Sequence, residues 1–500
     1  MKTISRRNIL IASMAGLASG SAWLSACSRT DTGGVATAPR STPRARIDGF
    51  RGRIIEKGDA AYESWRQGMV WQMRKPDRFP EMILRPVDTG DVAAAVRFAC
   101  GAGMKVSMRS GGHNIWGASL RDEGMLIDLA NFKQVDVQPD AGTARIGPSM
   151  WARDIMAALE KHDQAFPVAH CATVPLGGYA LGGGLGLNGD EWGGMACNNI
   201  LGGTVVTAEG EVLRVGEKSH PDLLWAMRGG GGALPGVVTE LHLKTYRRPA
   251  NVFSATYVFP LALLDIALDL LDEIVALSPA NTELLALMLH NPQAPPDAPP
   301  DMRKAIAVRA QIYADSLDGA HSTLDAIAAI PAADQSVVSM PAVAESFEKL
   351  FSDSMDWRRG FGFGRFAVEN AWTNDRAEAV RGIAAEFMKA PAGHSHVVVQ
   401  PKLAPAIDGN GAFSAAGNTY IGIYGVWNDG DTDDANVAWL NRMCSSLDKH
   451  AVGHYINEIN AANDPDRVKA CYSTENWKRL RDIRNHWDPE NLFHDFPGVS

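Results

Sequence analysis

Short apolar runs alternate with amphipathic stretches along the first half of the chain, from about residue 80. Runs rich in Val, Ile, Leu, Met and Thr predict strands, and they lie at 82–84, 106–108, 125–127, 204–208, 212–215 and 237–245. Two stretches, 88–103 and 151–162, carry apolar residues at helical spacing and predict helices. Glu209-Gly210 separates two of the strands and predicts a hairpin.

The pattern changes near residue 250, where longer elements replace the glycine-rich ones. Helices are predicted at 261–277 and 475–487, the second ended by Asp488-Pro489. Strands are predicted at 305–313, 397–401 and 419–427. We therefore expect an α+β protein with an N-terminal domain at 47–250, a second domain with a sheet at 251–455, and a closing segment at 456–500.

Residues 1–27 predict an export signal. Basic residues (Lys2, Arg6 and Arg7) precede a weakly apolar run and then small residues. The run is too short to span a membrane. The segment Ser5-Arg6-Arg7-Asn8-Ile9-Leu10 resembles the twin-arginine export motif.

A second targeting feature follows directly. Leu24-Ser-Ala-Cys27 resembles a bacterial lipobox, which makes Cys27 a candidate for lipid attachment, with ordinary cleavage as the alternative. Residues 28–46, rich in Thr, Pro, Arg and Gly, predict a flexible tether. We expect an exported protein, periplasmic or anchored to a membrane as a lipoprotein.

Composition narrows the function classes. The 500 residues are 46% hydrophobic and 21% charged, which is typical of a folded globular protein. The formal charge is −9, with no long basic stripe, and this excludes a nucleic-acid binder. No C-x-x-C or H-x-x-x-H spacing indicates a metal site among the six cysteines and 13 histidines.

Glycine is in excess, at 49 residues, and 18 of them lie between 177 and 236. Glycine adopts positive φ and leaves the backbone open to a close ligand. Runs such as 182–184 and 229–232 exceed what turns need, so we expect a backbone cradle for the phosphates of a dinucleotide.

Gly184-Leu-Gly186-Leu-Asn-Gly189 also fits the G-x-G-x-x-G pattern of nicotinamide-binding proteins. That motif must follow a buried strand and open a helix. Here Pro175-Leu-Gly-Gly precedes it, and 190–200 is too short and too rich in glycine to form the helix. The context therefore disfavours a nicotinamide site.

Two segments carry a stronger pattern. They read Arg109-Ser-Gly-Gly-His113-Asn-Ile-Trp-Gly117 and His170-Cys171-Ala-Thr-Val-Pro-Leu-Gly-Gly-Tyr-Ala-Leu-Gly-Gly-Gly184. With Pro221–Trp225, Arg228–Gly232 and the closing Asp488-Pro-Glu-Asn-Leu-Phe493, they resemble the berberine-bridge-enzyme-like branch of the vanillyl-alcohol-oxidase-type flavoproteins. The resemblance covers nearly all of residues 80–250 and 415–495.

The resemblance implies an FAD-binding domain of two α/β subdomains, of the vanillyl-alcohol-oxidase or PCMH type, and a substrate domain whose antiparallel sheet is covered by helices. It implies FAD held by two covalent bonds, from His113 to the 8α methyl and from Cys171 to ring carbon 6. The further cofactor contacts that it implies are Arg109, Ser110, Gly111, Gly112, Asn114, Val174, Gly177, Gly178, Tyr179, Gly182, Gly183, Gly184, Gly236, Val237, Val238 and Asn491.

The same resemblance implies hydride transfer to flavin N5 while a base removes a proton. It places the base either at Tyr420, on the strand 419–427, or in Tyr455-Ile-Asn457. Val174 stands at a position that the family links to oxygen access. Tyr179, where the family often has histidine, and Pro175, in place of a usual glycine, depart from the pattern.

The sequence thus predicts a covalent-FAD oxidase or dehydrogenase of a small-molecule alcohol, with O2 or another electron acceptor. Sugars, oligosaccharides and aromatic or polyketide alcohols remain open as substrates, a carbohydrate or other secondary alcohol being favoured. Trp116, Trp357, Trp372 and Trp427 are candidates for stacking on a substrate ring. The alternatives are an exported nicotinamide-dependent oxidoreductase and a binding lipoprotein without turnover. The sequence does not determine the oligomeric state.

Overall fold

The structure, a computed structural model, describes residues 46–291, 294–295, 302–351, 364–401, 410–414 and 417–499. The predicted export signal, Cys27, nearly all of the tether and Trp357 lie outside the described residues. None of the helices in these ranges has the length and apolar character that crossing a membrane requires.

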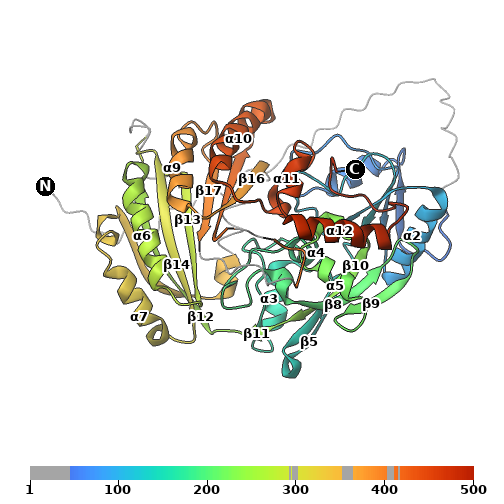
Figure 1. The fold of residues 1–500 in the computed structure, drawn as a ribbon, viewed down its shortest axis with the longest axis horizontal. Helices are drawn as coiled ribbons and strands as arrows, with labels where there is room; N and C mark the ends of the chain where they lie inside the picture. Colours follow the sequence, from blue (N-terminus) through green and yellow to red (C-terminus); the bar gives the residue numbers. More distant parts are fainter. Residues whose placement is uncertain are drawn as a thin grey trace, which may run out of the picture. The chain divides into compact units, whose positions relative to one another are not determined.

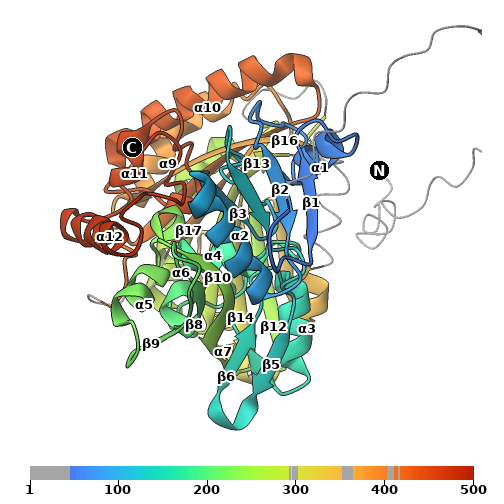
Figure 2. The same cartoon turned by 90° about the vertical axis from the view of Figure 1, so that its right-hand side faces the viewer.

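The first sheet has four strands and belongs to the N-terminal part of the chain (Figures 1 and 2). Their order is β1 (Arg53–Glu56), β2 (Met82–Arg85), β4 (Met125–Asp128) and β3 (Val106–Arg109). β4 pairs in parallel with β2 and β3, whereas β1 is antiparallel to β2. The connecting helices are α1 (Tyr62–Gly68) and α2 (Thr89–Ala102).

α2 shows why this part of the chain folds as the sequence predicts. Asp88 caps the helix, since its side chain accepts a hydrogen bond from the Asp91 backbone N–H. Gly103 ends the helix in the left-handed conformation, at φ 63°. Val92, Ala95 and Ala99 are fully buried and form the face that packs on the sheet. The helix predicted from Asp88 to Gly103 is confirmed.

The second sheet is antiparallel. Its strand order is β5 (Val135–Gln138), β6 (Thr143–Ile146), β10 (Val237–Lys244), β8 (Ile200–Val206) and β9 (Val212–Gly216). β8 and β9 form the predicted hairpin. The helices of this region are α3 (Ala152–Glu160), α4 (Leu176–Leu181) and α5 (Pro221–Met227), and β7 (Gln164–Ala165) pairs with β11 (Tyr246–Arg247).

The third sheet has seven antiparallel strands, drawn on the left of Figure 1 with its helices on one face. Its order is β15 (Val338–Glu345), β12 (Asn251–Pro260), β14 (Lys304–Ala314), β13 (Thr282–His290), β17 (His396–Pro401), β18 (Thr419–Trp427) and β16 (Arg365–Thr373). The covering helices are α6 (Leu264–Leu277), α7 (Leu317–Ala328), α9 (Arg376–Phe387) and α10 (Asp433–Leu447).

The end of the chain returns to the first two sheets. α11 (Pro465–Lys469) precedes α12 (Thr474–Trp487), and α12 packs against α5. Beyond α12, Phe493 bridges to Val106 at the start of β3. Residues 46–500 group as one compact unit. The third sheet begins with β12 at Asn251, next to the predicted boundary.

Two leucines of α6 test the helix layer over the third sheet. Leu270 is fully buried and Leu277, two turns later, is 37% exposed. We expect Leu270→Ala to lower the free energy of unfolding by about 2–5 kcal/mol because it leaves a cavity. Leu277→Ala, the matched control, should lower it by about 0.5 kcal/mol. Denaturant unfolding measures both, and equal losses would contradict this packing.

Candidate active site

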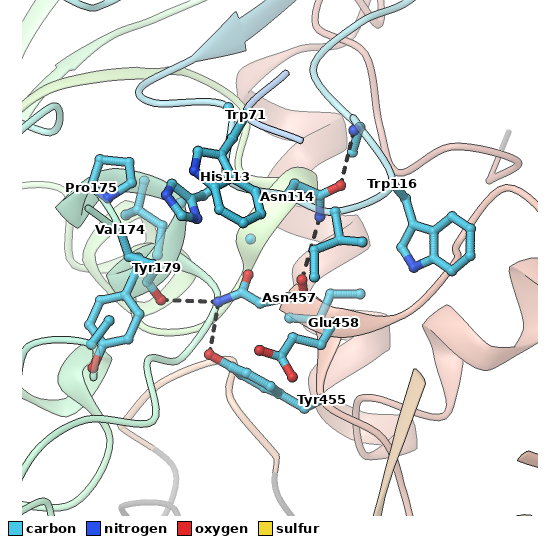
Figure 3. Close-up of a pocket in the computed structure, with 18 of the residues that line it drawn as sticks. Trp71, His113, Asn114, Trp116, Val174, Pro175, Tyr179, Tyr455, Asn457 and Glu458 are labelled. Carbon is cyan, nitrogen blue, oxygen red and sulfur yellow. Dashed lines mark hydrogen bonds between the residues drawn. The ribbon is translucent and has the colours of Figure 1, made fainter. Parts of the chain in front are cut away.

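A cavity of about 810 Å³ is lined by all three sheets and by the closing segment. Its walls come from the loop after β3, the segment 169–187, the segment 231–238, one face of the seven-stranded sheet and residues 455–462. Figure 3 shows part of this lining and labels ten of its residues. Segments more than 300 residues apart in sequence therefore line one cavity.

The histidine and the cysteine predicted to bind the flavin meet at one hydroxyl. His113 Nε2 lies 3.0 Å from Thr173 Oγ1, and Cys171 Sγ lies 3.5 Å from the same oxygen. The His113 ring stacks on Trp71 with centroids 4.7 Å apart (Figure 3). Two loops that are distant in sequence thus bring a ring nitrogen and a thiol to the same wall of the cavity.

The loop that carries His113 is held by Arg109. Its guanidinium donates to Asp128 Oδ1 at 2.7 Å, to the Met69 carbonyl at 3.0 Å and to the Gly111 carbonyl at 3.0 Å. Gly112 adopts φ 70°, and a Cβ there would lie 2.1 Å from the Met69 carbonyl oxygen. Arg109 lines the cavity, but these bonds make its guanidinium the support of the loop.

Tyr455 and Asn457 are fixed against the glycine turn at 182–184. The Tyr455 hydroxyl accepts hydrogen bonds from the Gly184 backbone N–H and from Asn457 Nδ2, both at 2.9 Å. Asn457 Nδ2 also donates to the Tyr179 carbonyl at 3.1 Å (Figure 3). The two residues predicted in the closing segment are therefore positioned by the backbone of the glycine-rich segment.

Glu458 is the residue that sequence reasoning missed. It ends the short helix η8 (Ile456–Glu458) and lines the cavity. Its Oε2 accepts a hydrogen bond from the Tyr420 hydroxyl and another, at 2.7 Å, from the Tyr424 hydroxyl. The available signal was its place directly after Tyr455-Ile-Asn457.

Gly422 lets both tyrosines reach this carboxylate. It lies between them on β18, and a Cβ there would come within 3.0 Å of each phenol ring or its hydroxyl. Tyr420 is buried at 2% exposure. Burial and the Glu458 charge raise the pKa of Tyr420 well above 10, so its hydroxyl keeps its proton as a donor. This geometry favours Glu458, rather than Tyr420, as the proton acceptor.

The pKa of Tyr455 is also raised, mainly by burial and by the charge of Glu458. Its bonds from Asn457 and from the Gly184 N–H act in the opposite direction, since they stabilise a phenolate. The net direction is upward, so Tyr455 serves as a neutral neighbour of Glu458.

Two polar residues of β16 anchor the closing segment through hydrogen bonds to its backbone. The Asn370 side chain accepts from the Tyr455 backbone N–H at 2.7 Å and donates to its carbonyl at 3.0 Å. Glu369 accepts from the Asn460 N–H at 2.8 Å, and Arg467 lies 3.1 Å from it. Burial raises the pKa of Glu369 to about 7, although Arg467 opposes the shift. Both ends of the segment that carries Glu458 are thus anchored.

A second carboxylate joins the sheet to the loop before Cys171. Glu283 on β13 pairs with His170 Nε2 and accepts from the Asn188 backbone N–H and the Tyr313 hydroxyl, each at 2.9 Å. Burial opposes the charged state of both partners, yet the pairing keeps the pKa of His170 raised and that of Glu283 lowered. This ion pair fixes the thiol loop relative to the sheet.

One end of the cavity is positively charged. Arg78, Arg121 and His494 line it, and the buried Nε of Arg121 and Nε2 of His494 have no hydrogen-bond partner among the described residues. Burial and Arg78 lower the pKa of Arg121 to about 10, and burial and Arg121 lower that of His494 to about 4. The unpartnered Nε–H of Arg121, next to Arg78, fits the diphosphate of a dinucleotide such as FAD.

The predicted cofactor contacts divide into two groups. Those that line the cavity are Arg109, Ser110, Gly112, His113, Asn114, Cys171, Val174, Gly177, Gly178, Tyr179, Gly236 and Val238, together with the predicted catalytic residues Tyr420, Tyr455 and Asn457. Those outside the lining are Gly111, Gly182, Gly183, Gly184, Val237 and Asn491.

The glycine turn corrects one expectation. A Cβ at Gly182 would lie 2.1 Å from Asn457 Oδ1, at Gly183 2.9 Å from Tyr455 and Phe413, and at Gly184 2.6 Å from Ala196. At these three positions the protein packs against its own backbone, which explains the absence of a side chain; their contact with a cofactor stays a prediction. The glycine excess therefore has two causes. Gly182–Gly184 allow close packing within the protein, whereas Gly178 lines the cavity and has open space where its Cβ would be.

Three other placements differ from the expectation. Gly111 lies against the Pro175 ring, 2.4 Å from where its Cβ would be. Asn491 adopts φ 51° and its side chain accepts from Arg484 at 2.8 Å, so it shapes the last turn of the chain. The Tyr179 hydroxyl donates to the Pro167 carbonyl at 2.7 Å. This hydroxyl, which was expected near the polar edge of the flavin, therefore already has a hydrogen-bond partner in the protein.

The G-x-G-x-x-G segment has no nucleotide-binding context. α4 ends at Leu181, and the segment is followed by turns and the short helix η2 (Ala196–Asn199). Among the described residues, no group of His, Cys, Asp and Glu is arranged to hold a metal. Cys197, Cys444 and Cys471 are buried thiols, and Cys100 is an exposed one.

The structure has the PCMH-type FAD-binding fold. The family model described as FAD binding domain matches residues 80–216, and the model described as berberine and berberine like matches 454–500. These two matches make the chain similar to FAD-linked oxidoreductases of the berberine-bridge-enzyme-like family.

Individual relatives agree with this placement. The chain is 26% identical over 437 residues to the FAD-linked oxidoreductase penO of Penicillium crustosum, covering 86% of this chain and 92% of the relative. It is 35% identical over 230 residues to the (R)-6-hydroxynicotine oxidase of Paenarthrobacter nicotinovorans, covering 45% and 49%. The solved 6-hydroxy-D-nicotine oxidase of Arthrobacter nicotinovorans superposes with a TM-score of 0.77 at 22% identity, over 90% of this chain and 98% of that one. The predicted fold class is confirmed.

Gly182 tests the packing of the glycine turn. We expect Gly182→Ala to lower the free energy of unfolding by about 1–3 kcal/mol because its Cβ would displace Asn457. Gly101→Ala, at an open position in α2, is the control and should stabilise the protein by about 0.5–1 kcal/mol. Denaturant unfolding compares the two, and a neutral Gly182→Ala would contradict this packing.

Proposed function

We propose that this protein is an FAD-dependent oxidase or dehydrogenase that carries its flavin on two covalent bonds, from His113 and Cys171, and oxidises an alcohol. The observation that carries the proposal is the Glu458 carboxylate, held by two tyrosines in the same cavity where His113 and Cys171 meet. The charged end of the cavity, with Arg78 and Arg121, would hold the diphosphate. Open glycines such as Gly178 would leave room for the cofactor.

When bound, FAD supplies the acceptor for the hydride that leaves the carbinol carbon. Glu458 takes the hydroxyl proton, so the alcohol loses two electrons and two protons and becomes a carbonyl compound. Tyr420 and Tyr424 fix the orientation of the carboxylate by donating to its Oε2. Asn370 and Glu369 hold the segment that bears it.

Two further expectations belong to this proposal. Electrons pass to O2 or another acceptor, and Val174 lines the cavity at the position that the family resemblance links to oxygen access. The protein is exported through a twin-arginine signal and reaches the periplasm, with Cys27 as a possible lipid anchor; both rest on the sequence at 1–27. A small-molecule alcohol is the substrate.

Proton transfer to Glu458 is tested by Glu458→Gln. We expect this change to slow anaerobic flavin reduction by about 100- to 10,000-fold because the amide cannot accept the proton. Tyr420→Phe removes only one hydrogen bond to the carboxylate and should slow reduction by about 3- to 10-fold. Stopped-flow absorbance measures both rates. A severe loss of the flavin reduction rate in Tyr420→Phe, with a normal rate in Glu458→Gln, would identify Tyr420 as the base instead.

The two attachments are tested by acid precipitation. The wild-type pellet should retain all the yellow colour, and His113→Ala and Cys171→Ala should each retain it through the remaining bond. The double variant should release its flavin to the supernatant. Cys100→Ala, at an exposed thiol outside the cavity, is the control and should behave like the wild type. Release of all the flavin from the wild type would overturn the covalent claim.

A further inference from the structure

The two residues predicted to bind the flavin are held by different parts of the fold. The loop that carries His113 is supported within the first sheet, where Arg109 of β3 donates at 2.7 Å to a carboxylate at the end of β4. The loop that carries Cys171 is supported through its neighbour His170, whose Nε2 pairs with Glu283 on β13 of the seven-stranded sheet. The two predicted attachments therefore have separate supports.

The Glu283 carboxylate is fixed in one orientation. Its side chain is only 5% exposed, and both of its oxygens are engaged. Oε1 pairs with His170, and Oε2 accepts hydrogen bonds from the Asn188 backbone N–H and from the Tyr313 hydroxyl, each at 2.9 Å. The three donors come from three different segments, and together they offset the cost of removing the carboxylate from water. Glu283 is thus a rigid point to which His170 is tied.

The side chain of His170 is what anchors this residue. In the part of the chain that the structure describes, the backbone N–H and carbonyl of His170 make no hydrogen bond. On the far side of Cys171, the Ala172 carbonyl accepts a hydrogen bond at 3.2 Å from the Arg153 N–H, in the first turn of α3. The ion pair with Glu283 therefore supplies the anchor on the near side of the thiol.

From these contacts we infer that the Glu283–His170 ion pair positions Cys171 for its bond to the flavin and has no part in the bond from His113. The inference rests on the proposed function, since it assigns two positioning residues to one of the two covalent attachments. His170 and Cys171 are adjacent and both line the cavity, so a shift of the His170 ring moves the thiol along the cavity wall. His113 keeps its stacking contact with Trp71 when the ion pair is broken.

The bond at issue joins Cys171 Sγ to ring carbon 6. It forms with loss of the thiol proton and of the hydrogen on that carbon as a second proton. The two electrons released pass through the flavin to O2 or to the other acceptor of the proposed function, so the step is balanced. Misplacing a reacting group by about 1 Å slows a reaction by up to about 100-fold. Attachment through Cys171 therefore depends on β13, whereas attachment through His113 does not.

Acid precipitation of paired variants separates the two attachments. In His113→Ala the flavin is held by Cys171 alone, and in Cys171→Ala by His113 alone. Adding Glu283→Gln to His113→Ala should lower the fraction of flavin retained in the pellet about tenfold, because the thiol is displaced. Adding it to Cys171→Ala should leave the retained fraction unchanged, which also shows that the protein folds and binds FAD. His170→Ala should reproduce both results.

The absorption spectrum gives a second readout, which a general loss of stability would not change selectively. A sulfur on ring carbon 6 is conjugated with the flavin, whereas the 8α bond is separated from the ring by a saturated carbon. Flavin peptides from a digest of Glu283→Gln, with both attachment residues present, should show the spectrum of a flavin bound through His113 only. Glu386→Gln is the matched control. Its carboxylate pairs with Arg442 at 2.7 Å on the helix layer outside the cavity, and it should retain the wild-type spectrum.

Two results would overturn the inference. One is equal retention of flavin by His113→Ala with and without Glu283→Gln. The other is loss of flavin when Glu283→Gln is added to Cys171→Ala, because the effect would then not be selective for the thiol. Release of all the flavin from the wild type, or from His113→Ala with Glu283 intact, would instead contradict the proposed attachment by two bonds. The failure of the inference and that of the proposed function are thus distinguishable.

Discussion

The site depends on a close approach between two backbone segments that are more than 270 residues apart. The Tyr455 hydroxyl accepts a hydrogen bond from the Gly184 N–H, and Cβ atoms at Gly183 and Gly182 would lie 2.9 Å from Tyr455 and 2.1 Å from Asn457. An alanine methyl at 182 would occupy the space of the Asn457 amide. Glu458 is the residue after Asn457, so the packing of Asn457 against the glycine turn also fixes the position of the Glu458 carboxylate.

The seven-stranded sheet contributes a second constraint, because its side chains hold charged groups at two points on the same face. Glu283 holds His170, the residue before Cys171, and Tyr420 and Tyr424 hold Glu458. Both carboxylates are bound by several donors, which offsets the cost of removing them from water. One sheet thus sets the location both of the loop that carries Cys171 and of the Glu458 carboxylate. We expect relative motion of these two groups to be small.

Local elements were predictable because their determinants are local. Asp88, Gly103 and the apolar spacing between them predicted α2, and the Glu209-Gly210 turn predicted the β8–β9 hairpin. The motifs around His113 and Cys171 indicated residues that do line one cavity. Glu458 escaped detection because its significance comes from Tyr420 and Tyr424, which reach it only through the register of β18 against the closing segment.

The reason for the glycine runs was equally hidden in the sequence. A glycine that faces a cofactor and a glycine that faces another side chain of the same protein read alike, and only the contacts separate Gly178 from Gly182. The contacts of the site also show which part of the fold carries each of its residues. Loops from the first two sheets carry His113 and Cys171, the closing segment carries Glu458, and the seven-stranded sheet carries Tyr420 and Tyr424. The cavity is therefore complete only when all three sheets and the closing segment come together.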